Sequence, residues 1–128
     1  MPAVPKRRGH PASQVLGGSI DDQGRYDAIK LAGLLDWTQQ EMAAYLGKDP
    51  SAISRSSASR SYQEPLAALA SVVTRVLDQM DGNWSMTRAW LQTPNVALDR
   101  QSPKKKIMGG QLTMVDKLLT ETEAGFAL

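Results

Sequence analysis

Residues 38–55 read TQQEMAAYLGKDPSAISR, and this stretch decides the fold of the chain. It begins at Thr38, a good N-cap, and Glu41 stands three positions later, where its side chain can bond back to the cap amide. Gly47 follows the apolar residues of this first helix, at the place where a left-handed turn residue is favoured. Pro50 then suits the first position of a second helix. Two short helices joined by a tight glycine turn are typical of a helix-turn-helix.

The second helix of this pair has an outward face that suits the major groove of DNA. Ile53 points inward, and the candidate DNA-binding residues are the outward ones with one turn lysine: Lys48, Ser51, Ala52, Ser54 and Arg55. The Arg55 guanidinium can bind guanine or hold a phosphate, and the Ala52 methyl can touch thymine. No acidic residue lies between Pro50 and Gln63, so the local surface is predicted to be positive.

Two interpretations of this motif stay open. The helices can pack together with no role in DNA binding. If they do bind DNA, the few cations neutralise few phosphates, so we expect binding to need a dimer or a larger complex.

Upstream of the motif, the sequence predicts an arm and one further helix. Residues 1–23 are rich in proline and glycine with little periodicity, which predicts a flexible N-terminal arm. From Arg25 onward the apolar residues fall at i, i+3, i+4 and i+7, which predicts a helix that ends at Asp36 and Trp37. Residues 24–64 are therefore the predicted helix-turn-helix region.

Downstream of the motif, residues 65–128 are predicted to form a small helical domain. A long apolar stripe runs from Pro65 to Met80, and three shorter helices follow, the last from Leu112 to Glu123. No segment alternates with a period of two, so the predicted class is all-α with six or seven helices. Val72 and Val76 broaden the long stripe, so we expect this helix to be partly buried by dimerisation or by a partner.

Composition excludes several classes of function. The 128 residues carry a net charge of +2, spread evenly along the chain, and include no cysteine and only one histidine, His10. Disulfides and thiolate zinc sites are thus excluded, and one histidine in the arm makes no metal site. No phosphate loop or framed carboxylate pair is present, so we expect no enzyme, catalytic residue, metal or cofactor. No apolar run is long enough for a membrane span, and no secretory signal is recognised, so we expect a cytoplasmic protein.

The second half contains a string that resembles a known family. Residues 89–98 read AWLQTPNVAL, and Ser102-Pro103 follows. This is similar to the toxin-binding domain of the Xre/MbcA/ParS antitoxins, which pair with RES-domain toxins and have an Xre-like helix-turn-helix upstream. The resemblance covers about residues 25–128. It departs at Asp99 and Arg100, where the family usually has Gly-Gly, and at Lys104–Lys106, where it usually has apolar residues. We expect these lysines to form a solvated face or to meet an acidic partner.

The resemblance also implies a mechanism of inhibition. RES toxins are NAD-dependent, either degrading NAD or ADP-ribosylating a target, and the family's antitoxins lay their C-terminal end against the NAD pocket. The corresponding toxin-binding residues of this chain are Glu121, Glu123, Gly125, Phe126, Ala127 and Leu128. Phe126 is the only phenylalanine and follows a helix stop, so it suits a partner's pocket. The alternative is that Phe126 folds back onto the chain's own core.

The sequence thus predicts the antitoxin of a type II toxin–antitoxin pair. Its expected partners are a RES-domain toxin, operator DNA for autoregulation, and a second copy of the chain or a toxin–antitoxin hetero-oligomer, with no membrane. One alternative is a stand-alone helix-turn-helix transcriptional regulator whose second half only dimerises. A second alternative is an adaptor for some other helical partner.

Overall fold

The computed structural model describes residues 16–125. These residues form seven α-helices and three short 3₁₀ turns with no strand, which confirms the predicted all-α class. The helices are α2 (Ala28–Leu35), α3 (Gln39–Leu46), α4 (Pro50–Arg55), α5 (Gln63–Gln79), α6 (Trp84–Gln92), α7 (Pro103–Met108) and α8 (Leu112–Glu123). The 3₁₀ turns are η1 (Leu16–Ser19), η2 (Arg60–Tyr62) and η3 (Val96–Leu98).

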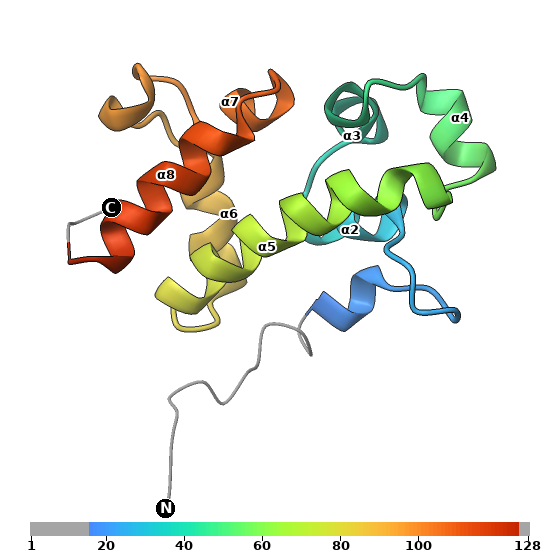
Figure 1. Ribbon diagram of the computed structural model, residues 1–128, viewed down its shortest axis with the longest axis horizontal. Helices are drawn as coiled ribbons and strands as arrows, with labels where there is room; N and C mark the ends of the chain where they lie inside the picture. The colour runs from blue at the N-terminus through green and yellow to red at the C-terminus, as the bar shows by residue number, and fades with distance from the viewer. Residues whose placement is uncertain (1–15, 126–128) are drawn as a thin grey trace, which may run out of the picture.

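The long helix α5 is the axis of the molecule (Figure 1). Helices α2, α3 and α4 lie toward its N-terminal end, and α6, α7 and α8 lie toward its C-terminal end. The helix begins at Gln63, two residues before the predicted start, because Pro65 fits within the first turn, where its missing N–H is not needed. Its apolar stripe is buried as predicted, with Leu66, Leu69, Val73, Val76 and Leu77 all fully enclosed.

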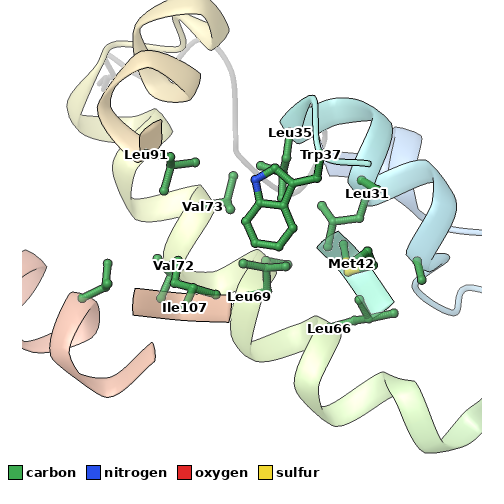
Figure 2. Packing of buried hydrophobic residues seen from close by; sticks show 14 of the residues in the cluster. Leu31, Leu35, Trp37, Met42, Leu66, Leu69, Val72, Val73, Leu91 and Ile107 are labelled. Atoms are coloured by element: carbon green, nitrogen blue, oxygen red, sulfur yellow. The ribbon is translucent and has the colours of Figure 1, made fainter. Parts of the chain in front are cut away.

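One hydrophobic core joins the two halves of the chain. Trp37, which follows the C-cap of α2, belongs to this core together with Leu31 and Met42 from the first half and Leu69 and Leu91 from the second (Figure 2). Residues 24–64 and residues 65–125 therefore bury their apolar faces against each other.

Local signals fix the ends of the helices. In α3 the Glu41 amide donates to Thr38 Oγ1 at 3.0 Å, and the Thr38 amide donates to Glu41 Oε1 at 2.9 Å, so the predicted capping box is confirmed. Gly47 ends α3 with a φ of 68°, as predicted. Asn83 and Ser102 each accept a backbone N–H at the start of α6 and α7, and so cap these helices.

The structure differs from the predicted arm over residues 16–23. Leu16–Ser19 form the turn η1, and the Leu16 side chain is only 3% exposed because it enters the core beside α2. The Asp27 amide donates to the Ser19 carbonyl at 2.7 Å, and Ile20 forms an isolated bridge with Tyr26. The glycines at 17 and 18 thus belong to a packed turn. Residues 1–15 of the predicted arm lie outside the described residues.

The expectation that Val72 and Val76 need a second chain to bury them is wrong. Val72 and Val76 are 3% and 0% exposed within a single chain, in which α6 and α8 pack against α5. The broad apolar stripe is therefore satisfied by the chain's own core.

Within residues 16–125, every helix is too short or too polar to cross a lipid bilayer.

Candidate functional site

The α3–α4 pair is a rigid unit with a short connection. Only residues 47–49 separate the two helices. Ile53 is fully buried and anchors α4 in the core, while Ser54 Oγ donates to Gln39 Oε1 at 3.1 Å and ties α4 to the start of α3. Beyond α4, Ser57 Oγ donates to the Asp27 carboxylate at 2.8 Å, and the Ala28 amide donates to the Ser57 carbonyl at 2.8 Å. The C-terminal half of α4 is thus fastened to α2 and α3.

The predicted DNA-binding residues all reach the surface of this pair. Lys48, Ser51, Ser54 and Arg55 are exposed, and Ala52 is half-buried. Lys48 and Arg55 have no ion-pair partner among residues 16–125, so their charges face solvent. Helix α4 has only six residues and Arg55 is the last, which makes its outward face short.

The segment that carries the family resemblance folds into a tight loop after α6. The Asn95 side chain accepts the Ala97 amide at 2.9 Å, and the Asn95 amide donates to the Gln101 carbonyl at 3.0 Å. Leu98 is buried and fastens η3 to the core. Asp99 and Arg100 then take left-handed conformations, with φ values of 58° and 64°.

Two large apolar side chains, one on α6 and one on η3, face solvent. Val96 is 83% exposed and Met86 is 53% exposed, and these are the exposed large hydrophobic residues found within the described chain. A shallow pocket lies beside Val96 and is lined by Trp90, Thr93, Pro94, Asn95 and Val96. We call the surface of Met86, Trp90, Pro94 and Val96 the α6–η3 patch.

An ion cluster fastens the C-terminal end of α8 to α5. The Arg75 guanidinium donates two hydrogen bonds to the Glu123 carboxylate, at 2.9 and 3.0 Å, and also pairs with Asp116. The hydrogen bonds from Arg75 hold the pKa of Glu123 below its ordinary value and raise the pKa of Arg75. Arg75 lies far from α8 in the sequence, and no local pattern pointed to it.

The predicted toxin-binding residues have different environments. Glu123 is held by Arg75, whereas Glu121 is exposed and has no ion-pair partner within residues 16–125. Gly125 is exposed at the end of the described chain, with a φ of 115°. Phe126, Ala127 and Leu128 lie outside the described residues. Glu121 is therefore the carboxylate available to a partner at this end.

The three consecutive lysines of α7 do not form one solvated face. Lys104 Nζ lies 2.8 Å from Glu41 Oε2 and 5.9 Å from the centre of the Trp37 ring. Lys106 is buried, with Nζ 3.1 Å from Asp99 Oδ2 and 3.3 Å from Gln111 Oε1. Only Lys105 is exposed. The expectation of a uniformly solvated triplet is wrong, because the helical rotation between neighbours points two lysines at carboxylates from other segments.

No group of three or more histidine or carboxylate residues within residues 16–125 is placed to hold a metal ion. No protein-family model matches the chain, and no curated protein or solved structure is detectably similar to it.

Proposed function

We propose that this protein is the antitoxin of a type II toxin–antitoxin pair that neutralises a RES-domain, NAD-dependent toxin by direct binding. In this proposal residues 65–128 bind the toxin, and residues 24–64 are an Xre-like helix-turn-helix that binds operator DNA for autoregulation. The observation that carries the proposal is the exposed α6–η3 patch.

The α6–η3 patch has the character of a protein-binding surface. Single exposed apolar residues are common, but here the exposed large ones fall on one segment, beside the half-buried Trp90. The loop below the patch is held by the Asn95 hydrogen bonds and by buried Leu98, so Val96 is presented with little freedom. A rigid apolar surface loses little conformational entropy on binding.

The backbone at Asp99 and Arg100 supports the family resemblance. The family usually has Gly-Gly here, and glycine is favoured where φ is positive because it has no Cβ. Both residues have positive φ in this chain, so the backbone keeps the shape that glycine would favour while the side chains differ. The positive φ at both positions is therefore compatible with the Gly-Gly that the family usually has here.

The Arg75 cluster supports a role for the C-terminal end. Because Arg75 holds Glu123, the chain leaves α8 from a fixed point on α5. Residues 126–128 follow directly, and Phe126 is the apolar anchor that the proposal assigns to the toxin pocket. Glu121 is the carboxylate proposed to meet the cations that surround a bound nucleotide.

Co-expression with a RES toxin encoded beside this gene tests the proposal. We expect the full chain to restore growth, and Val96→Asp to reduce both growth rescue and capture of the toxin, because a charge would be buried in the interface. Ala44→Asp is the matched control, since it adds the same charge at an exposed site on α3. Equal rescue by both variants would remove the α6–η3 patch from the interface.

A stand-alone transcriptional regulator is the second candidate, favoured by the exposed cations of the α3–α4 pair. The two candidates differ in what the neighbouring gene does. If that gene is not toxic when expressed alone, and the chain still binds its own promoter, the regulator is the better description.

A further inference from the structure

We infer that the DNA-binding surface extends beyond the α3–α4 pair onto α7, where Lys105 contacts the phosphate backbone beside the groove that α4 enters. This inference rests on the DNA-binding part of the proposed function. It gives a role to the lysine triplet, the feature in which the chain departs most from the family it resembles.

The first support is position. Helix α3 packs against α4 on one side and against α7 on the other, and the three helices lie in the order α7, α3, α4 along one edge of the molecule (Figure 1). Packed helices have axes about 8–10 Å apart, so α7 lies about 20 Å from α4. The major groove is about 12 Å wide, so α7 lies outside the groove that α4 would enter, on the side of one flanking backbone.

The second support is the neutralisation of Glu41. This residue is the only acidic one on α3, and its charge would repel a phosphate. Lys104 approaches it to 2.8 Å, and its hydrogen bond keeps the pKa of Glu41 below the ordinary value, so both charges are present at neutral pH. The surface of α3 that adjoins α7 therefore carries no net negative charge.

The third support is the charge that remains. Lys104 and Lys106 are used by internal carboxylates, which leaves Lys105 exposed, with no ion-pair partner within residues 16–125. On α3, α4, α7 and the turns that join them, the cations without such a partner are Lys48, Arg55, Arg60 and Lys105, and the exposed carboxylates nearby are Asp36, Asp49 and Glu64. A shallow groove between α3 and α7, lined by Glu41, Ser102, Lys104, Lys105 and Met108, lies next to Lys105. A cationic edge of this length is complementary to a polyanion.

An acidic protein surface is the competing partner for Lys105. The position of α7 against α3 favours DNA, because the cations it would join, on α4 and in the turn before it, are the ones proposed to bind the operator. Of the two surfaces proposed to meet the toxin, the C-terminal end of α8 lies at the opposite end of the molecule from α4 (Figure 1), whereas α6 packs against α7.

Binding to two labelled duplexes at several salt concentrations tests the inference. One duplex is the promoter region of the chain's own gene and the other has random sequence, each spanning about three helical turns. We expect Lys105→Gln to weaken binding to both by a similar factor, about 5- to 10-fold at 0.1 M salt, and to reduce the slope of log K against log salt by about 1. Lys105→Arg should restore both quantities. Arg55→Ala should instead weaken binding to the promoter more than to the random duplex.

Lys117→Gln is the matched control, because it removes the same charge from an exposed site on α8. Equal affinities and slopes for the Lys105→Gln and Lys117→Gln variants would overturn the inference while leaving operator binding intact. If the wild type binds neither duplex, the DNA-binding part of the proposed function fails instead. If Lys105→Gln weakens toxin capture and leaves DNA binding unchanged, Lys105 belongs to an acidic protein contact and the inference is wrong.

Discussion

Trp37 is a residue that packs against both halves of the molecule. Its indole is 5% exposed, meets the Tyr45 ring edge-on at 6.4 Å, and lies beneath the Lys104 ammonium. These neighbours come from α3 and α7, which the sequence separates widely. A single side chain thus links residues 24–64 to the second half of the chain.

Replacing Trp37 tests this role. Trp37→Ala should lower the free energy of unfolding by about 3–5 kcal/mol, because it leaves a large cavity among enclosed residues. Trp37→Phe should cost less, since a ring remains beneath Lys104. Urea unfolding followed by far-UV circular dichroism measures both. A loss below about 1 kcal/mol for the alanine variant would mean that the core does not centre on this side chain.

Glu41 makes stability depend on pH in a defined direction. The Lys104 hydrogen bond and the Thr38 amide hold its folded-state pKa below the value of 4.5 that it has when unfolded. The unfolded chain therefore binds the proton more readily, and this contribution to stability is full above about pH 4.5 and is lost as pH falls through the lower, folded-state value.

The Glu41→Gln variant isolates this effect, because glutamine can still complete the capping box but carries no charge. We expect the variant to be less stable than the wild type at pH 7 and the difference to be smaller at pH 3. Thermal unfolding at both pH values measures it. A difference that is equal at the two pH values would show that the ion pair with Lys104 contributes nothing.

The C-terminal end of helix α8 is held by α5, an element that is distant in the sequence. Its bounds, Leu112–Glu123, coincide with the predicted ones, because the apolar spacing and the flanking glycines are local signals. Its attachment through Arg75 to Glu123 could not be predicted, since it depends on how α5 and α8 cross. The same division holds for α7. Ser102 and Pro103 are a local signal for its start, whereas the partners of its lysines lie on other segments and could not be predicted.

Shortening the chain at α8 tests the proposed inhibitory end. Removing Gly125–Leu128 should leave the helix content unchanged, because α8 and its Arg75 contacts end before the cut. It should restore toxicity in co-expression, since a buried aromatic anchor contributes about 2 kcal/mol or more to an interface. The shortened chain should still capture the toxin weakly through the α6–η3 patch.

Phe126→Ser is the control for chain length, and it should behave like the truncation if the aromatic ring is the anchor. Normal growth of cells that express the toxin with the shortened antitoxin would place inhibition elsewhere on residues 65–125.

At the scale of the whole molecule, hydrogen bonds also link the two regions that share the hydrophobic core. The Tyr45 hydroxyl donates to the Pro65 carbonyl at 2.7 Å, and Arg88 Nε donates to the Leu34 carbonyl at 2.7 Å. Each bond links residues 24–64 to residues 65–128, as the Lys104–Glu41 pair also does. Sequence patterns showed which faces are apolar, but not that the two regions would bury them against each other.

The two regions should therefore fold only together. A fragment of residues 16–64 exposes the faces of Leu31, Leu35 and Trp37, so we expect it to lack a cooperative unfolding transition. The full chain should unfold in one step, with tryptophan fluorescence and circular dichroism giving the same midpoint. Two separate midpoints, or a fragment that unfolds cooperatively, would contradict a shared core.

The shared core also bears on how such proteins diversify. Where a DNA-reading part and a partner-binding part are joined by a loose linker, recombination can exchange either part and leave the other working. Here a foreign second half would have to supply three features at once: a surface complementary to Trp37, a hydrogen-bond acceptor for Tyr45 and a cation for Glu41. New operator or partner preferences in descendants of this chain should thus arise by point substitution on its outer edges, at positions such as Ser51, Val96 and Lys105, while the interior stays matched.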